Sequence, residues 1–420
     1  MRIAVFAFGS RGDVEPGLAL GGRLREYGHD VVVAAPIDSV EFARQTGADV
    51  HPINVDAHEF LSSPEGRDML ARGDVRAYVR RMLDKKHEVA PTLHDDLIAA
   101  AGSTDVVVGT RLVEEETSSI AEWLGVPFVG LHYAPNRPNG RLPSPLIGTR
   151  SLTPLGNRLT YQVAERMLWR RDRPDVNILR GRLHLPKATA PVSVRLAAAQ
   201  APEIQAYSRH LVPELAEWDD RRPLVGNLRL TELQRAAIRG DHQDAGLDRW
   251  LAADEPPIYY GFGSMPVRDG RKTLDMITEA SRRLGTRALV AAGWSDLPRD
   301  TTADDGRVRV VAGLDHDRVL PRCRLAVHHG GAGTTAASVG AGLPTVVCSV
   351  FADQHFWGQA VARLGIGATM RRSDATAASL TELIKPLLAE DVTLRAKRVA
   401  AAMADEDPAG EAARIISAAT

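Results

Sequence analysis

Short apolar runs alternate with helix-like segments in both halves of this 420-residue chain. Each run has a length that suits one buried strand, and turn residues follow it. The runs are residues 3–8, 30–35, 105–109, 127–131, 257–262, 287–292, 307–311, 324–327 and 344–348. Strands that alternate with helices are typical of parallel βαβ units. The pattern therefore predicts an α/β protein with two Rossmann-like domains that face each other across a cleft, with ligands at the carboxyl ends of the strands.

A Pro- and charge-rich stretch separates the two sets of runs. It covers residues 202–222 and is the expected linker. We expect an N-terminal domain over residues 1–201 and a C-terminal domain over residues 223–404. The first strand of each domain ends in a Gly-Ser turn, which is Gly9-Ser10 in one and Gly263-Ser264 in the other.

Composition narrows the class of protein. A hydrophobic content of 44% and a charged content of 25% are those of a soluble globular protein. The formal net charge of −1 gives no electrostatic case for nucleic acid or acidic membranes as partners. Cys323 and Cys348 fall on or beside expected buried strands, so we expect free thiols in a reducing cytoplasm. Because no signal peptide or long apolar span is found, we expect a cytoplasmic protein without stable membrane insertion.

A glycine-rich loop, His328-His-Gly-Gly-Ala-Gly-Thr-Thr335, follows an apolar strand and leads into a helix of small residues. Glycines let the backbone approach an anion, and a helix start offers N–H groups at the positive end of a dipole. A histidine just before such a loop can donate a hydrogen bond to a phosphate oxygen. We interpret the loop as a cradle for a diphosphate; the alternative is an ordinary strand–turn–helix loop.

The loop after the first strand reads Gly9-Ser-Arg-Gly-Asp-Val-Glu-Pro16 and matches neither Gly-x-Gly-x-x-Gly nor a Walker A sequence. Ser10 and Arg11 could bind a diphosphate there, and Asp13 could act as a general base. Asp13 also suits the start of the helix expected from Pro16, where the dipole and capping favour a carboxylate. Both roles can hold at once.

Two further acidic motifs lie in the second half. Asp353 and Gln354 follow the run at 344–348, and their oxygens and amide suit adjacent sugar hydroxyls, although a helix cap and a surface residue are the alternative. Asp315 and Asp317 form an Asp-x-Asp pair that we interpret as a helix-capping loop. No His/Cys cluster has zinc spacing, so we expect no catalytic metal.

These elements, in this order, resemble the family 1 glycosyltransferases of the GT-B fold. The resemblance is closest to actinobacterial enzymes that glycosylate glycopeptide antibiotics and mycobacterial glycopeptidolipids, and it extends to sterol glucosyltransferases. It spans nearly the whole chain. The matching segments are Gly9–Pro16, Tyr260–Pro266, Gly293-Trp294, His328–Thr335 and Ala352-Asp-Gln354.

The resemblance implies a role for each matching position. The residues expected at the donor diphosphate are Ser10, Arg11, Ser264, His329, Gly331, Ala332, Gly333 and Thr334. Asp353 and Gln354 would hold the donor sugar, and Trp294 or the stretch Val311–Gly313 would meet the nucleobase. Apolar candidates for the acceptor pocket of the first domain are Phe60, Met82 and Tyr133. Residues 405–420 would cross back onto the first domain as a helix.

The family pattern also indicates which residue would act as the general base. Many members carry a histidine, supported by a separate aspartate, where this chain has Asp13. Asp13 fits the antibiotic-type subgroup, in which the aspartate itself is the candidate base. The segment where the supporting aspartate would fall, Val108–Thr110, has no carboxylate.

The sequence therefore predicts an inverting, metal-independent glycosyltransferase. Its co-substrate would be a UDP- or dTDP-linked hexose or deoxyhexose, with no other cofactor, and its acceptor a hydrophobic natural product or glycolipid hydroxyl. A monomer or homodimer is expected, with no nucleic-acid partner. Two alternatives remain open: an epimerase or hydrolase of the same fold, and a non-catalytic nucleotide-sugar-binding activator. The presence of Asp13 with the Asp353-Gln354 pair argues against the latter.

Overall fold

The computed structural model gives the fold and describes most of the chain. The described residues are 1–63, 65–66, 68–69, 75–148, 151–216, 218–239, 245–263, 269–293, 295, 297, 301–350 and 353–419. The chain divides into two compact units. The first comprises Met1–Ala57, Val79–Arg239 and Glu406–Thr420, and the second His58–Tyr78 and Gly240–Asp405. Each unit is built around its own sheet.

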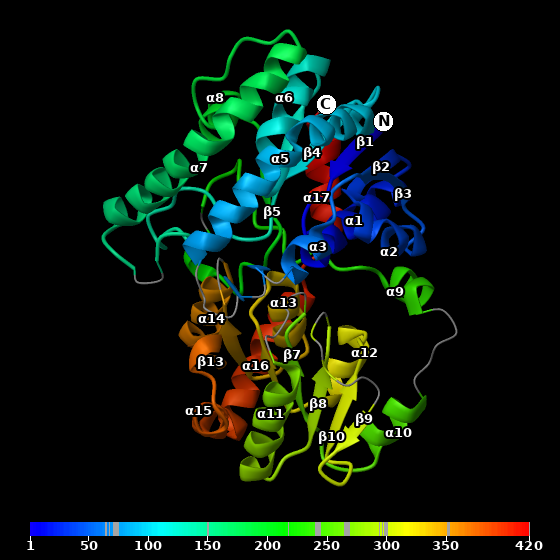
Figure 1. Cartoon of the computed structure of the whole chain (residues 1–420), viewed down its shortest axis with the longest axis vertical. Coiled ribbons are helices and arrows are strands. Elements are labelled where there is room, and N and C mark those ends of the chain that lie inside the picture. Colours follow the sequence, from blue (N-terminus) through cyan, green and yellow to red (C-terminus); the bar gives the residue numbers. More distant parts are fainter. Residues whose placement is uncertain are drawn as a thin grey trace. The chain divides into compact units, whose positions relative to one another are not determined.

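The first unit holds a parallel six-stranded sheet in the order β3-β2-β1-β4-β5-β6 (Figure 1). Its strands are β1 (Arg2–Phe6), β2 (Asp30–Pro36), β3 (Asp49–Ile53), β4 (Val106–Thr110), β5 (Phe128–His132) and β6 (Glu203–Gln205). Its helices are α1 (Arg11–Glu26), α2 (Val40–Gln45), α5 (Val75–Ala101), α6 (Glu114–Leu124), α7 (Pro154–Arg182), α8 (Val192–Ala198), α9 (Glu232–Arg239) and α17 (Pro408–Ala418). A further helix, α3 (Ala57–Ser62), begins where the two units divide.

Strand β1 shows why this sheet is buried on both faces. Ile3 and Val5 lie in one apolar cluster, and Ala4 and Phe6 lie in another, as the two-residue period of a strand requires. Helices α1 and α17 cover the first face, where Ile416 of α17 is fully buried. Helices α5, α6 and α7 contribute to the second cluster.

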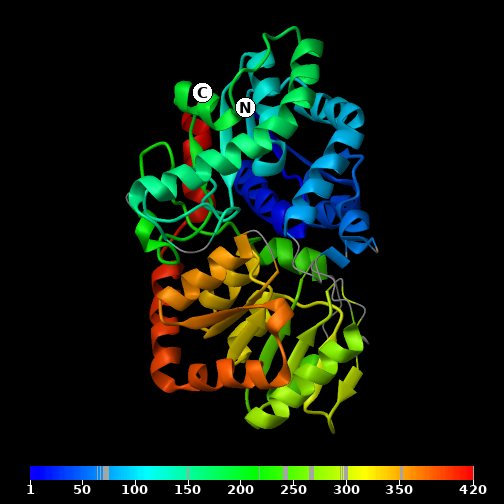
Figure 2. The same cartoon turned by 60° about the vertical axis from the view of Figure 1, so that its left-hand side comes forward.

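The second unit holds a seven-stranded sheet in the order β13-β12-β11-β7-β8-β10-β9, with helices over both faces (Figure 2). Its strands are β7 (Ile258–Gly261), β8 (Ala288–Ala291), β9 (Thr301–Ala303), β10 (Val308–Val311), β11 (Leu325–His328), β12 (Thr345–Ser349) and β13 (Gly367–Arg371). Only β9 is antiparallel to its neighbour among these described strands. The helices are α10 (Ala245–Ala252), α11 (Gly270–Leu284), α12 (His316–Val319), α13 (Ala332–Gly340), α14 (Asp353–Arg363), α15 (Ala377–Ile384) and α16 (Glu390–Ala404).

Three details refine the expectations from sequence. Helix α1 begins at Arg11, ahead of the expected start at Pro16, because Ser10 and Asp13 form a capping box there. The segment expected as the linker, 202–222, contains β6 and belongs to the first unit. Cys323 and Cys348 are free and buried, as expected.

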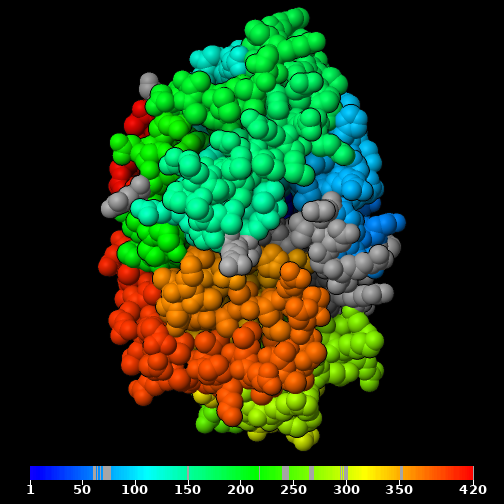
Figure 3. Space-filling model, turned by 90° about the vertical axis from the view of Figure 1, so that its left-hand side faces the viewer, coloured from blue at the N-terminus to red at the C-terminus, as the bar shows by residue number. Residues whose placement is uncertain are grey.

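Helix α7 is long and reaches the surface of the first unit over much of its length, where its residues are the blue-green spheres of Figure 3. None of the described helices combines the length and apolar character needed to cross a membrane.

Candidate active site

The turn between β1 and α1 positions Asp13. Gly9 has φ of +135°, and a Cβ built on it would lie 2.4 Å from Oδ2 of Asp13. The backbone N–H and the hydroxyl of Ser10 donate to that same oxygen at 2.8 and 3.0 Å. Asp13 is therefore held at the carboxyl end of β1 by a turn that only glycine fits at position 9. Its side chain remains partly exposed to solvent.

Tyr133 lies in the neighbourhood of Asp13. It directly follows β5, and its hydroxyl is buried without a hydrogen-bond partner in the described part of the chain. Burial raises the pKa of Tyr133 well above its ordinary value, and the negative charge of Asp13 adds to this rise. The candidate base and one candidate acceptor residue, which are far apart in sequence, are thus close enough in the first unit for their charges to interact.

Three different helices carry the other candidates expected in the first domain, which are Arg11, Met82 and Phe60. The guanidinium of Arg11 lies 4.2 Å from the centre of the Phe42 ring and pairs with Glu15 at 3.2 Å, and the side chain is exposed. Met82 lies on α5 and is partly exposed. Phe60 lies on α3, but its side chain is outside the described part of the structure. Their roles stay predictions.

In the second unit, the glycine-rich loop joins β11 to α13. Gly330 has φ of +94°, and a Cβ there would lie 2.5 Å from the Val347 side chain, so this position also requires glycine. The first helical bond of α13 runs from the Thr335 N–H to the Gly331 carbonyl at 2.9 Å. The N–H groups of residues 332–334 precede this bond and stand at the positive end of the helix.

His329 lies between two glycines at this loop. A Cβ on Gly263 would lie 2.8 Å from its Cε1, and a Cβ on Gly331 would lie 2.6 Å from its Nε2. The ring is buried, and its Nδ1 has no hydrogen-bond partner in the described part of the chain. Burial lowers the pKa of His329 to about 4, so the ring is neutral at pH 7. A neutral imidazole has one N–H donor, for which the Gly261 backbone and a ligand would compete.

The neighbouring His328 has a different role. Its Nδ1 accepts a hydrogen bond from the Gly330 N–H at 3.0 Å, which fixes the turn of the loop. The side chain is fully buried, and burial lowers its pKa well below the ordinary value. His328 therefore stabilises the conformation of the loop, whereas His329 makes no such contact with it among the described residues.

Asp353 and Gln354 begin α14 after strand β12. The indole N–H of Trp357 donates to Oδ2 of Asp353 at 3.0 Å, and burial raises the pKa of Asp353 to about 6. Gln354 is buried, and its Oε1 accepts from the Val350 N–H at 2.8 Å. Both side chains are thus fixed by contacts inside the second unit.

The remaining candidates are only partly described. Ser264 and Trp294 lie outside the described residues. Val311 ends β10 with its side chain in an apolar cluster, and Gly313 is exposed just beyond it. Asp315 is the N-cap of α12, where it accepts from the Asp317 N–H at 3.0 Å.

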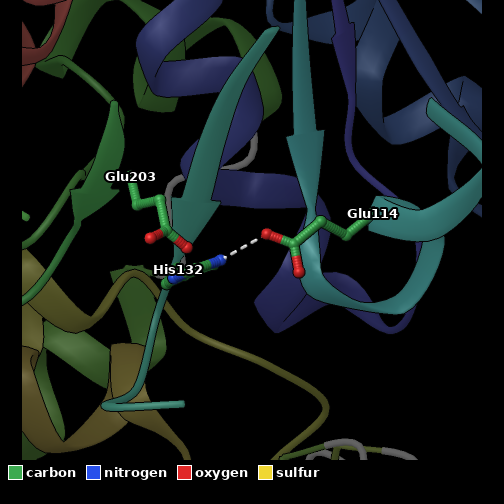
Figure 4. A group of neighbouring side chains, drawn as sticks. All are labelled: Glu114, His132 and Glu203. Atoms are coloured by element: carbon green, nitrogen blue, oxygen red, sulfur yellow. Dashed lines mark hydrogen bonds and ion pairs between the residues drawn. The ribbon is translucent and has the colours of Figure 1, made fainter. Parts of the chain in front are cut away.

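Sequence reasoning missed a buried polar cluster, Glu114, His132 and Glu203, that could formally hold a metal ion (Figure 4). Nε2 of His132 lies 2.8 Å from Oε1 of Glu114. The guanidinium of Arg137 donates to that same oxygen at 2.5 Å and also to Glu203. All four side chains are fully buried. Since Arg137 already supplies the cation between the two carboxylates, we interpret the cluster as an internal ion-pair network.

Comparison with known proteins identifies the family of the chain. Residues 3–143 match the glycosyltransferase family 28 N-terminal domain, and residues 294–418 match the C-terminal domain of erythromycin biosynthesis protein CIII-like proteins. An uncharacterized glycosyltransferase of Mycobacterium leprae is 36% identical over 98% of this chain and 95% of its own. A sterol 3-beta-glucosyltransferase of Arabidopsis thaliana is 31% identical over 97% of this chain and 64% of its own.

Solved structures show the same fold. The crystal structure of a Streptomyces sp. SF2575 glycosyltransferase complexed with thymidine diphosphate superimposes with a TM-score of 0.63 at 19% identity, covering 100% of this chain and 99% of that one. Two α/β units, each built on a mainly parallel sheet, are the architecture of the GT-B class of glycosyltransferases. The chain belongs to the glycosyltransferase family that contains these mycobacterial and sterol-modifying relatives.

Proposed function

We propose that this glycosyltransferase moves a hexose or deoxyhexose from a UDP- or dTDP-linked donor to a hydroxyl of a small natural product or glycolipid. The transfer inverts the anomeric centre, needs no metal ion, and uses Asp13 as the general base. The observation that carries the proposal is the loop from His329 to Thr334, where a buried neutral imidazole stands beside the N-terminus of α13.

The second unit binds the donor in this proposal. Negative charge develops on the diphosphate as the glycosidic bond breaks, and the N–H groups of residues 332–334 are fixed dipoles that can stabilise it. His329 adds one neutral N–H donor without adding a charge. Asp353, held by Trp357, accepts hydrogen bonds from the sugar hydroxyls. The thymidine diphosphate bound to the Streptomyces relative supports a dTDP or chemically similar donor.

The first unit supplies the base. In one displacement the acceptor oxygen forms a bond to the anomeric carbon, and the bond to the diphosphate oxygen breaks with its electron pair. The acceptor proton passes to Asp13. An aspartate with an ordinary pKa of about 3.9 is a weak base, so proton transfer must accompany attack on an already positive carbon. General base catalysis of this kind typically contributes about 10²- to 10⁴-fold.

The acceptor is assigned to the same unit as the base. Tyr133 supports this assignment, because its buried hydroxyl lies in the neighbourhood of Asp13 and has no protein partner among the described residues. The sterol-modifying relative supports a hydrophobic acceptor. A cytoplasmic enzyme fits the free buried cysteines.

The test is a panel of UDP- and dTDP-sugars, with and without hydrophobic hydroxyl acceptors, in excess EDTA. We expect nucleotide diphosphate release that requires an acceptor and persists in the chelator. Release without any acceptor would favour a hydrolase, and binding without turnover would favour an activator protein. A rate that collapses in EDTA and returns with Mg²⁺ or Mn²⁺ would contradict the metal-independent mechanism.

A further inference from the structure

An apolar stripe runs along the exposed face of α7 in the first unit. Large apolar side chains on this face are 40% to 77% exposed, and Ile178, nearer the end of the helix, is 58% exposed. They are Leu155, Leu159, Val163 and Met167, and Leu152 directly precedes the helix. Since positions four apart share one face of a helix, these side chains form a continuous surface. Contiguous exposed apolar surface of this kind marks an interaction site.

The stripe is not the result of a loosely packed helix. On the opposite face, the hydroxyl of Tyr161 accepts from Asn139 at 2.8 Å and donates to the Pro143 carbonyl at 3.2 Å. Oγ1 of Thr160 accepts from the Ser144 N–H at 2.8 Å. These contacts fasten α7 to the loop that follows Tyr133, so the apolar stripe and the candidate acceptor residue belong to one fixed platform.

The charges around the stripe are positive. Arg158, Arg166 and Arg170 are exposed on α7, and in the described part of the structure their side chains make no hydrogen bond or ion pair. Residues 151–169 contain one acidic residue, Glu165, which is less exposed than these arginines. The chain as a whole is close to neutral at −1, so this positive charge is a local feature of α7.

We propose that this face of α7 docks onto the surface of a lipid bilayer that contains anionic lipids. Leucine and methionine side chains would enter the interface between headgroups and acyl chains while the arginines contact the negative headgroups, as in interfacial helices. A second copy of the chain fits less well, because an isologous contact through this face would bring like charges together. If the chain docks in this way, its acceptor is a membrane-resident lipid that carries a free hydroxyl; this part of the inference rests on the proposed function.

The test measures binding of the full chain to vesicles by co-sedimentation, without donor or acceptor. The vesicles are pure phosphatidylcholine or phosphatidylcholine mixed with phosphatidylglycerol. We expect binding to the anionic vesicles, and about tenfold or more weaker binding to neutral ones or in 1 M salt. The double variant Leu155→Ser, Leu159→Ser should bind anionic vesicles about tenfold or more weakly. The matched control is Leu233→Ser, because Leu233 is 82% exposed and lies on α9, away from α7 (Figure 1). This variant should bind anionic vesicles like the native chain.

A second variant pair, Arg158→Gln with Arg166→Gln, should remove the preference for anionic vesicles. The circular dichroism spectrum and the thermal unfolding midpoint should match those of the native chain in all variants, which shows that they fold. Nucleotide diphosphate affinity, measured by calorimetry, should also be the same in all variants, which separates this inference from the proposed function. If the native chain ignores anionic vesicles, or the leucine variant binds them as well as the native chain does, the docking proposal is wrong even when nucleotide binding is intact. A native dimer that the leucine variant converts to a monomer, without vesicle binding, would assign the stripe to self-association instead.

Discussion

Burial sets the chemistry of the two titrating side chains on which donor binding rests. The pKa of His329 falls to about 4, so the ring acts near neutral pH as a hydrogen-bond donor and not as a cation. The pKa of Asp353 rises to about 6, so its carboxylate forms only above that pH. Both shifts have desolvation as their largest cause.

Replacing His329 with alanine should weaken nucleotide diphosphate binding by about 1.5–3 kcal/mol, the range for a hydrogen bond to a charged group. Titration calorimetry with UDP and dTDP measures this directly. The control is His29→Ala, because His29 bonds Ser417 in the first unit and should leave the affinity unchanged. Equal affinities for native and His329→Ala proteins would make His329 a structural residue of the loop.

Affinity for an intact nucleotide sugar should rise between pH 5 and pH 7 and level off above. Below its pKa of about 6, Asp353 is protonated, so it loses its charge and part of its capacity to accept from sugar hydroxyls, and binding at pH 5 should be up to about tenfold weaker. His329, with a pKa of about 4, stays neutral across this range. The Asp353→Asn variant should show weak, pH-independent binding. A pH profile that survives in this variant would assign the titration to another group.

At the level of single elements, the turn from β1 to α1 carries the base. Gly9→Ala should lower turnover by about tenfold or more, because its Cβ would overlap Oδ2 of Asp13 and its φ of +135° is strained for alanine. Donor affinity should be unchanged. Gly12→Ala is the matched control, since Gly12 lies in α1 and a Cβ there would meet Oγ of Ser10 at 3.8 Å, an ordinary contact, and it should stabilise the fold by about 0.5–1 kcal/mol. If both variants turn over like the native enzyme, the position of Asp13 does not limit the rate.

The elements also show what the sequence could and could not predict. The nine apolar runs all became strands, because each lies inside a sheet that is buried on both faces. The edge strands β3, β9 and β13 are only partly buried, so they have no apolar run to detect. Strand β6 is fully buried yet reads Glu-Ile-Gln, because Glu203 pairs there with Arg137. In the sequence, a strand with a buried charged residue of this kind looks as polar as a loop.

The candidate site was predictable only in part for a similar reason. Glycine loops and their polar residues can be read from the sequence, and so Asp13, His329 and Asp353 could be named as candidates. The protonation states of His329 and Asp353 depend on burial, which no local pattern reveals. The proximity of Tyr133 to Asp13 depends on β5 and β1 lying in one sheet on either side of β4.

At the scale of the whole molecule, each unit has its own apolar core, and most of the proposed donor contacts lie in the second. We expect nucleotide diphosphate to protect that unit selectively. Ligand at 100 times its dissociation constant adds about 2.7 kcal/mol to the stability of the unit that binds it. Hydrogen exchange should therefore slow around β11, α13 and α14, with little change in α5 or α7. Equal protection in both units would contradict this assignment.

The central claim is that Asp13 removes the acceptor proton while the second unit holds the donor. The most direct measurement compares acceptor-dependent nucleotide release by the native enzyme and by Asp13→Asn, together with donor affinity by calorimetry. An asparagine can still accept from Ser10 but cannot take a proton at neutral pH. Turnover of Asp13→Asn should be lower by about 10² or more, with donor affinity unchanged. Turnover that survives in Asp13→Asn, or donor affinity that falls in step with it, would show that Asp13 is not the general base.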